Sequence, residues 1–364
     1  MNSILKSLQD PKSFQTYIDE YMKTSTYKAE WKNELKTVEY CAAKVYQANM
    51  ATYAAAMVGS VVAKNAERPL HTMPDLGQLT GSIGRIADEW ELDNDYLDQM
   101  HLLEGKYNDM SRRGGYTQSQ LNAKYDELIK YSFKPFELAV IAPHKRIDML
   151  YFEGLFKGTQ TVSRTNNSKA NVSYTFDLDV KQLSATTNWG EVNATPIEDI
   201  KKLKDEARKK GRKILRLRMS ENTFFAMCKA KEIKDTFRLN LGEITINPAA
   251  PMISVDQMNI YLRSILLPTI QIDEDKFVEL PDKKVFNLIP DNRVVAMCAD
   301  KVAVPKCAEC LEAIDPVDGV SYSTYDNNLI GYWRDKKGYH LTNEMWMQPV
   351  FDGIEDFFIL KVGA

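Results

Sequence analysis

Three cysteines have a spacing that occurs in zinc sites and in redox-active pairs. Cys307 and Cys310 are separated by two residues, and Cys298 lies nine residues before Cys307. Because the thiolate is both the nucleophile and the metal ligand, a Cys-x-x-Cys pair is a candidate for either chemistry. A structural zinc site needs four ligands, however, and His340 is the only histidine that follows, whereas a redox pair is expected to open a helix. The sequence therefore favours surface or half-buried thiols in a loop, and it leaves their role open.

A dense acidic cluster at residues 88–98 is a second candidate metal site. In a calcium-binding loop that began at Asp93, Asp95 and Glu104 would occupy the third and twelfth positions. The sixth position, which needs glycine for the turn, is Asp98 instead. The sequence favours a helix that Asp93 caps and that ends at Gly105, with an apolar side made of Tyr96, Met100 and Leu103.

The remaining candidates lack residues that their chemistry requires. The glycine-rich segment GQLTGSIGR at 77–85 has neither the Lys-Ser/Thr ending of a phosphate-binding loop nor the third glycine of a dinucleotide fingerprint. No serine lies in an elbow motif, and the histidines are scattered along the chain at His71, His101, His144 and His340. His144 lies beside Lys145 and Arg146 and is expected to be solvated. We therefore predict no catalytic, cofactor-binding or metal-binding residue.

The composition is that of a globular chain without a strong charge bias. Its 364 residues, 44% of them apolar, can form the core of one elaborated domain or of two. The 47 Lys and Arg residues against 50 Asp and Glu give a net charge of −3, whereas a dedicated nucleic-acid-binding protein carries a basic excess.

The sequence also predicts that the protein is located in a reducing cytoplasm. The first thirty residues contain no apolar run of the kind that a secretory signal needs. The most apolar run, at 51–63, is too short to cross a bilayer. The five cysteines are too few and too scattered for a disulfide framework.

The first third of the chain is predicted to contain an arm, a helix and a loop. Residues 1–33 have isolated aromatic side chains and no broad apolar face, so we interpret them as an arm that orders against a neighbouring molecule. Residues 34–64 have an apolar stripe and many alanines, which is typical of a buried helix. Prolines and glycines make 68–85 an irregular loop or ribbon.

A long helix is predicted after a turn at 111–116. It begins at Thr117 or Ser119 and reaches Lys157, with interruptions expected at Pro135 and Pro143 because proline lacks a backbone donor. Alternating residues at 159–164 and 170–180, on either side of a polar turn, predict a β-hairpin.

Residues 189–229 are predicted to form a compact α/β unit. Thr195 and Glu198 have the spacing of a capping box, Pro196 suits the first position of a helix, and Gly211 ends that helix. Ser220 caps a second helix. Between the two helices, residues 213–219 alternate as a half-buried strand, with one side formed by Leu215, Leu217 and Met219 and the other by Arg216 and Arg218.

The rest of the chain is predicted to be rich in strands. Ser254 and Gln257 form a further capping box before a helix that reaches Ile265. Strands are expected at 269–272, 284–289 and 293–298. More strands follow within 320–364, with a turn at 326–328 and an apolar closing strand at 357–362.

The order of these segments resembles the major capsid proteins of tailed bacteriophages. The resemblance is carried by Trp189, ATPIEDI at 194–200, SENTFFAMCKAKEIKD at 220–235, NLIPDNRVVAMC at 287–298 and EMWMQPVFDGIEDFFILKV at 344–362. It extends over most of the chain, from Pro69 onward, and is strongest to the branch related to the phage lambda shell protein. The motifs are diffuse spacings and not a sharp fingerprint.

The resemblance implies an α+β protein with the Hong Kong 97-like capsid fold. The implied parts are an N-terminal arm and helix at 1–67, an extended loop region at 68–115, a peripheral domain with a long spine helix and hairpin at 116–186, an axial α/β domain at 187–319, and C-terminal strands at 320–364 that return to the peripheral domain. In the family, the extended loop laps over the adjacent subunit.

The resemblance also implies a structural protein of a virion and not an enzyme. Copies of the chain would join by head-to-tail contacts into pentamers and hexamers, which form an icosahedral head around double-stranded DNA. The implied partners are the chain itself, a portal, a scaffolding protein, decoration proteins where a phage has them, and packaged DNA contacted without specificity. Assembly would occur in the bacterial cytoplasm, without a cofactor or a membrane.

Two alternatives stay open. An encapsulin-like compartment shares the fold but encloses an enzyme instead of a genome. A cytoplasmic metal-dependent α/β enzyme would use the acidic cluster, or Cys307 and Cys310, to hold its metal.

Overall fold

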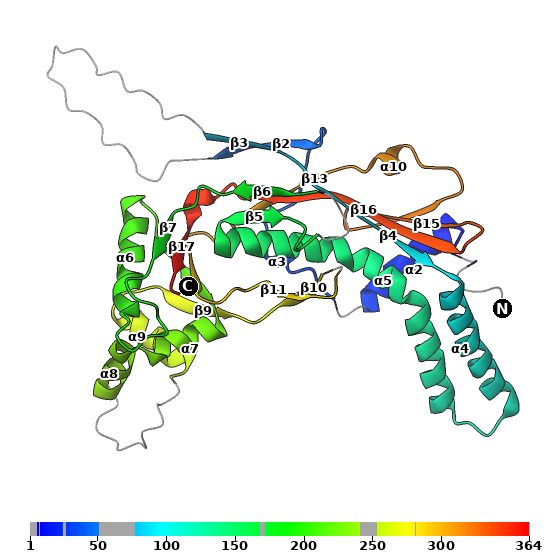
Figure 1. Ribbon diagram of the computed structural model, residues 1–364, viewed down its shortest axis with the longest axis horizontal. Coiled ribbons are helices and arrows are strands. Elements are labelled where there is room, and N and C mark those ends of the chain that lie inside the picture. The colour runs from blue at the N-terminus through cyan, green and yellow to red at the C-terminus, as the bar shows by residue number, and fades with distance from the viewer. Residues whose placement is uncertain are drawn as a thin grey trace, which may run out of the picture.

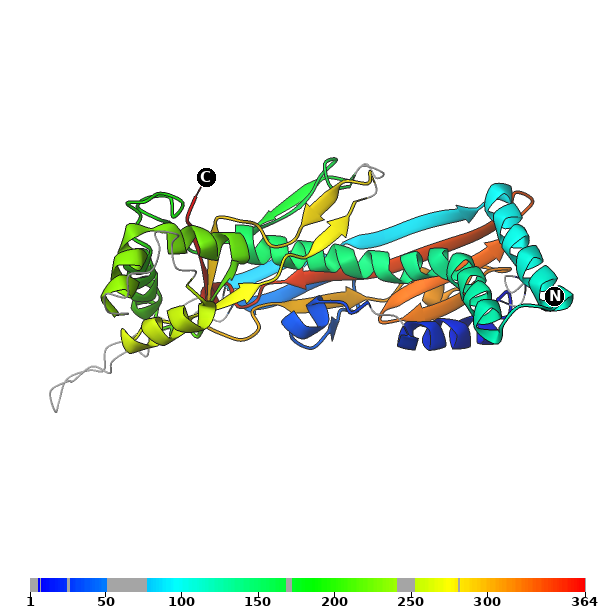
Figure 2. The ribbon, with the colours of Figure 1, turned by 90° about the horizontal axis from the view of Figure 1, so that it is seen from below.

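The longest element of the protein is helix α5 (Gln118–Lys157), which runs along the body of the computed structural model (Figures 1 and 2). Thr117 caps it in a capping box with Gln120, and Gly158 ends it with a φ of 73°. The expected interruptions at Pro135 and Pro143 are wrong, because the helix continues through both. A proline inside a helix removes one hydrogen bond and bends the helix, and neighbouring packing can hold the helix together across it. Figure 1 shows such a bend in α5.

The structure describes residues 6, 8–24, 27–50, 77–167, 172–240, 253–280 and 282–363. Two features that the sequence singles out lie outside the described residues, namely the apolar run at 51–63 and the first part of the predicted loop, at 68–76. Residues 241–252, which include Pro248 and Pro251, also lie outside them.

The larger sheet packs one face against α5. Within the described residues its order is β1 (Glu39–Tyr40), β13 (Val304–Ala308), β16 (Tyr339–Val350), β15 (Asn328–Arg334) and β14 (Ser321–Tyr325), and β4 (Arg85–Leu92) pairs with β16. All neighbours are antiparallel except β1 and β13. Alternate residues of β16, such as Leu341 and Met345, are buried in the clusters that contain α5.

A second sheet joins the two main hydrophobic clusters. Its order is β7 (Gln182–Ser184), β17 (Phe357–Lys361), β12 (Arg293–Met297), β8 (Arg216–Ser220) and β9 (Thr269–Asp273). On β17, Phe357 and Ile359 belong to the cluster around α5, whereas Phe358 and Leu360 belong to the cluster around α6 (Pro196–Lys209). The predicted closing strand is therefore confirmed, and it is buried on both faces.

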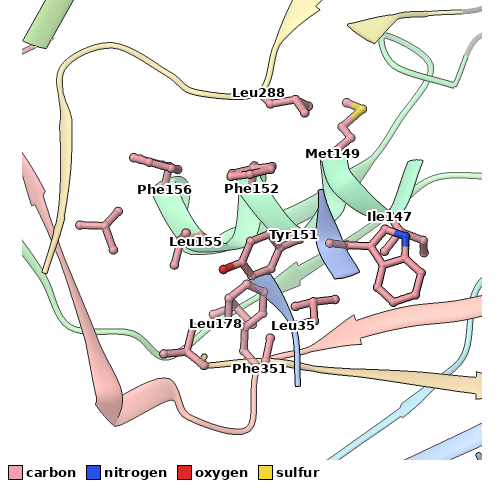
Figure 3. Packing of buried hydrophobic residues seen from close by; sticks show 14 of the residues in the cluster. Leu35, Ile147, Met149, Tyr151, Phe152, Leu155, Phe156, Leu178, Leu288 and Phe351 are labelled. Carbon is pink, nitrogen blue, oxygen red and sulfur yellow. The ribbon is translucent and has the colours of Figure 1, made fainter. Parts of the chain in front are cut away.

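Aromatic side chains of α5 form the centre of the first cluster (Figure 3). Tyr151 stacks on Phe351, with ring centroids 5.8 Å apart, and Phe152 and Phe156 point to the other side of the helix, near Leu288 (Figure 3). The predicted hairpin lies beside the end of α5 and is confirmed as β5 (Thr159–Val162) and β6 (Tyr174–Asp177).

The N-terminal arm packs on its own chain, contrary to the prediction. Helix α2 (Pro11–Thr24) buries Phe14, Ile18 and Met22 in a cluster with α5 and β15. The prediction is wrong because these three residues recur every four positions and form a stripe, which the isolated aromatic residues between them obscure.

The predicted helix at 34–64 is wrong over its described part. A single turn, α3 (Trp31–Glu34), is followed by β1 and then by β2 (Val45–Met50), which pairs with β3 (Gly77–Ser82). The backbone there bonds to distant strands, as when Cys41 N donates to Cys307 O over 2.8 Å. A local pattern cannot reveal such pairing. Figure 1 shows the β2–β3 ribbon along one edge of the body.

Helix α4 (Asn94–Arg113) lies antiparallel to the first part of α5 at one end of the molecule (Figure 1). Asp93 caps it as predicted and accepts a hydrogen bond from Tyr96 N. The predicted end at Gly105 is wrong, because the helix continues to Arg113. Gly114 and Gly115, with φ of 69° and 83°, then form the predicted turn.

The other end of the molecule carries α6 and three more helices (Figures 1 and 2), namely α7 (Glu221–Lys229), α8 (Lys231–Asn240) and α9 (Val255–Ser264). The caps at Ser220 and Ser254 are confirmed. The capping box at Thr195 is wrong, because its side chain makes no cap hydrogen bond. Instead, Glu232 accepts a hydrogen bond from Ile197 N.

The remaining predicted strands are present. They include β11 (Val285–Asn287), which pairs with β10 (Phe277–Glu279), and the β14–β15 hairpin, in which Asp326 and Asn327 both have positive φ. Two one-turn elements complete the described chain, α10 (Leu311–Ile314) and η1 (Ile354–Asp356).

Candidate assembly surfaces

The cysteines do not form a metal or redox centre in the described part of the chain. Cys307 lies within β13 and Cys310 donates to Glu344 O over 3.3 Å, and both are buried, so the prediction of surface or half-buried loop thiols is wrong for this pair. Burial raises the pKa of each thiol to about 11, and that of Cys298 to about 12, which disfavours the reactive thiolate.

The acidic cluster is divided between two elements. Residues 88–92 belong to strand β4, and Asp95, Asp98 and Glu104 lie on helix α4, so no loop surrounds a common point. Across the described residues, no group of three or more His, Cys, Asp or Glu side chains is placed to hold a metal ion. The calcium-loop alternative is therefore excluded at this position. The glycine-rich segment likewise forms strand β3 and the start of β4, where Tyr46 packs against Gly81.

His144 is buried, contrary to the prediction that it is solvated. Only 2% of its surface is exposed, and its ring stacks on Trp31, whose indole N–H donates to Nδ1 over 3.2 Å. Burial lowers the pKa of His144 to about 4. The charged neighbours Lys145 and Arg146 suggest that His144 is exposed to solvent. They do not show that His144 itself lies on the face of the helix that points inward.

Asp148 lies one turn further along the same helix face and contacts the same N-terminal segment. Its Oδ1 accepts a hydrogen bond from Trp31 N over 2.7 Å, and its Oδ2 accepts one from Tyr27 over 3.3 Å. Burial raises the pKa of Asp148 to about 7 in spite of these hydrogen bonds. His144 and Asp148 thus attach residues 27–31 to the spine helix.

Arg218 connects the second sheet to the same N-terminal segment. Its guanidinium donates to both oxygens of Asp273, over 2.8 and 3.0 Å, and to both oxygens of Glu34, over 2.5 and 3.0 Å. Burial acts to lower the pKa of Arg218, but the bonds and charges of Asp273 and then Glu34 outweigh it and raise the pKa. The prediction of a half-buried strand is therefore wrong at Arg218, where both faces of β8 are covered.

A polar cavity of about 250 Å³ lies over the larger sheet, between β4, β15, β16 and α10. Of the four acidic side chains that line it, Glu89, Glu312 and Glu344 have partners, and burial raises the pKa of the fourth, Asp88. Glu344 binds Arg85 over 2.5 Å, Glu89 contacts His340 over 3.1 Å, and Glu312 accepts from Tyr322 over 2.9 Å.

Exposed apolar side chains gather at three described places and are the best candidates for contacts with other molecules. On α10, Leu311 and Ile314 share one face and are 65% and 67% exposed. On the β10–β11 hairpin, Phe277 and Val285 lie on the outer face, because the intervening Val278 points inward. Soluble proteins rarely leave grouped apolar side chains uncovered, so such groups often mark interfaces.

The third place is the end of α9, where Ile260 and Leu266 are exposed. Leu266 is 79% exposed and has a φ of 60°, a conformation that costs a leucine roughly 1–2 kcal/mol. Lys204 Nζ holds its carbonyl oxygen over 2.6 Å. Sequence reasoning misses Leu266, because neither its exposure nor its backbone angle has a local signal.

The described helices include none that is both long enough and apolar enough to cross a membrane. No family model and no curated protein matches the sequence.

Solved structures do match. The chain aligns with a protein assigned as the capsid protein of a prophage in E. coli CFT073, with a TM-score of 0.55 and 12% identity, over 96% of this chain and 99% of that one. The chain has the fold of that capsid protein. The predicted α+β capsid fold is confirmed.

Two further structures show weaker likeness. The capsid of cyanophage A-1(L) has a TM-score of 0.48 at 12% identity, over 93% of this chain and 94% of that one. A phage-related protein from Bordetella bronchiseptica RB50 has a TM-score of 0.46 at 10% identity, over 95% and 96%.

Proposed function

We propose that this protein is the major capsid protein of a tailed phage, a structural protein without catalytic activity, and that it forms pentamers and hexamers in an icosahedral shell around double-stranded DNA. The observation that supports the proposal is the shared fold, which extends over nearly the whole of this chain and of the prophage capsid protein. Fold alone does not determine function. The exposed apolar groups supply the second support, since shells are built from repeated contacts between copies.

We propose that the three apolar groups take part in those contacts. Phe277 and Leu266 lie in the proposed axial part, 187–319, and Leu311 lies near its end. We also propose four further parts of the subunit: an N-terminal segment at 1–67, an extended loop region at 68–115, a peripheral part at 116–186 and C-terminal strands at 320–364. Each contact is weak alone, but a closed shell repeats it many times.

We further propose a portal, a scaffolding protein and packaged DNA as partners, decoration proteins where the phage has them, and the virion as the location after assembly in the host cytoplasm. DNA contact would be non-specific, consistent with a net charge of −3.

Electron microscopy of the purified, full-length protein tests the proposal. We expect closed shells with five-fold and six-fold clusters of subunits, and nucleic acid inside shells taken from infected or induced cells. Shells that contain a protein cargo would instead support an encapsulin-like compartment. Two or more equivalents of tightly bound zinc or calcium would support a metal-dependent enzyme, and a protein that stays monomeric with and without its scaffolding partner would contradict the proposal.

A further inference from the structure

Both larger sheets end at a strand whose outer edge is bonded to a side-chain amide. At β14, Thr324 N donates to Gln15 Oε1 over 2.9 Å, and Gln15 Nε2 donates to Thr324 O over 3.0 Å. At β9, Ile270 N donates to Asn259 Oδ1 over 2.6 Å, and Asn259 Nδ2 donates to Ile270 O over 2.9 Å. Each carboxamide thus occupies the place that a peptide group of a further strand would take.

The match is chemical as well as geometric. A carboxamide carries one N–H donor face and one C=O acceptor in a plane, as a peptide group does, so it can satisfy both backbone groups of one edge residue. An unsatisfied edge is a template for pairing with another chain, and natural proteins block such edges.

Both carboxamides are held in place by buried neighbours on their own helix. Gln15 lies between Phe14 and Ile18 on α2, which are buried in the cluster with α5. Asn259 lies between Met258 and Leu262 on α9, which are fully buried. Because apolar anchors flank each amide, the amide can remain at the edge without a strand beside it.

We propose that Gln15 and Asn259 block the free edges of β14 and β9 against strand pairing with a second copy of this chain. The second copy is the relevant partner because identical strands have matching lengths and side chains. Pairing of the same edge in two copies would give a closed two-fold dimer, whereas pairing of β14 in one copy with β9 in another would continue into open fibres. The inference does not depend on the proposed shell, although in a shell such pairing would compete with the contacts that close it.

Amide hydrogen exchange of the full-length, unassembled protein tests this inference. Gln15→Met and Asn259→Leu keep the side-chain length close to the original but remove both hydrogen bonds to the edge strand. Gln15→Met also removes the hydrogen bonds of Gln15 with Asp19 and Ser323. We expect exchange to rise by roughly tenfold or more in the peptide that contains Thr324 for the first variant, and in the peptide that contains Ile270 for the second, as expected when an intramolecular hydrogen bond is lost. Each variant should also dimerise at lower concentration than the parent, as measured by analytical ultracentrifugation, and the double variant, in which both edges are free, should form thioflavin-binding assemblies.

Gln118→Met is the matched control, because the Gln118 carboxamide contacts only the exposed Asn122 in the described hydrogen-bond pattern of α5. It should change neither exchange nor assembly. If circular dichroism shows that a variant does not fold, Gln15→Glu and Asn259→Asp, which keep the acceptor and remove the donor, decide in its place. Unchanged exchange at both edges, or faster exchange without dimerisation at lower concentration, would overturn the inference. The experiment uses dilute subunits, so a failure to form shells leaves its result intact.

Discussion

Asp148 and His144 respond to pH in opposite directions, although both attach the same N-terminal segment to α5. The pKa of Asp148 is raised to about 7, so its contribution to stability is complete below about 3.8 and is lost as the pH rises to about 7. The pKa of His144 is lowered to about 4, so its contribution is complete above about 6.5 and is lost as the pH falls to about 4. Over that interval the two effects oppose each other in the parent protein.

Replacing one residue of the pair should therefore reveal how the other residue makes the free energy of unfolding depend on pH. For Asp148→Asn, whose side-chain oxygen can still accept from Trp31 N, we expect the free energy of unfolding to rise with pH between about 4 and 6.5. At pH 8 this variant should be more stable than the parent by on the order of 2 kcal/mol, because no carboxylate is buried.

Urea unfolding at closely spaced pH values measures both slopes. His144→Gln serves as the reciprocal variant, and its stability should fall between about pH 4 and 7. Parallel pH profiles for the parent and both variants would show that neither group titrates in the buried state described here.

Arg218 is the second residue whose loss should be severe. Arg218→Met leaves Asp273 and Glu34 facing each other without a cation, so we expect a loss of roughly 3–5 kcal/mol in the free energy of unfolding. Arg216→Met is the control on the same strand, since Arg216 pairs with the exposed Asp300 over 2.8 Å and its loss should cost less than about 1 kcal/mol. If urea unfolding shows that both variants lose the same free energy of unfolding, burial of the Arg218 ion pairs does not increase their contribution to stability.

Replacing glycine with alanine should have opposite effects on stability at two positions inside helices. A Cβ at Gly154 of α5 would lie 2.8 Å from Phe351 Cζ, so Gly154→Ala should destabilise the protein by roughly 1–3 kcal/mol. A Cβ at Gly105 of α4 would meet no atom within 4 Å, so Gly105→Ala should stabilise it by about 0.5–1 kcal/mol through helix propensity. Thermal unfolding of both variants measures the difference, and the same sign for both would contradict the packing of α5 on Phe351.

Elements with local signals could be predicted from the sequence, and elements held by distant partners could not. Asp93, Thr117 and Ser254 cap helices as predicted, because a cap depends on residues within one turn. The prediction of a helix over residues 39–50 is wrong because the pairing partners of these residues, including Cys307, are far away in the sequence.

The candidate surfaces show the same division. The sequence correctly indicates that Leu217 and Met219 share one face of a strand, since their alternation has the period of a strand, and both are buried in the cluster around α6. It cannot show that Arg218 is buried or that Leu266 is exposed, because both depend on which elements cover them. The buried ion pairs depend on Arg218, and the proposed contact at the end of α9 depends on Leu266.

Leu266 should matter for the assembly of subunits and not for the folding of one subunit. Because its side chain is 79% exposed and Asp tolerates the φ of 60° better than Leu, Leu266→Asp should leave the free energy of unfolding unchanged or raise it by less than about 1 kcal/mol. If the end of α9 contacts other copies, the charge should prevent or strongly weaken shell formation, because a buried unpaired carboxylate is costly. Analytical ultracentrifugation compares the two proteins.

Val192→Asp is a suitable control, since Val192 is also exposed but lies outside the three apolar groups. Normal shells from Leu266→Asp would remove the end of α9 from the proposed contacts. Loss of shells from both variants would indicate a general effect of added negative charge.

The place of β17 in the second sheet has a consequence for biosynthesis. The strand pairs with β7 and β12 and supplies side chains to both main clusters, yet it is translated after every other strand of that sheet. While β17 is still inside the ribosome, the hydrophobic clusters around α5 and α6 both lack the side chains of this strand. A nascent chain at that stage does not have the folded surface that another subunit would recognise. Nascent chains that have not yet exposed β17 should therefore be poor competitors for assembly.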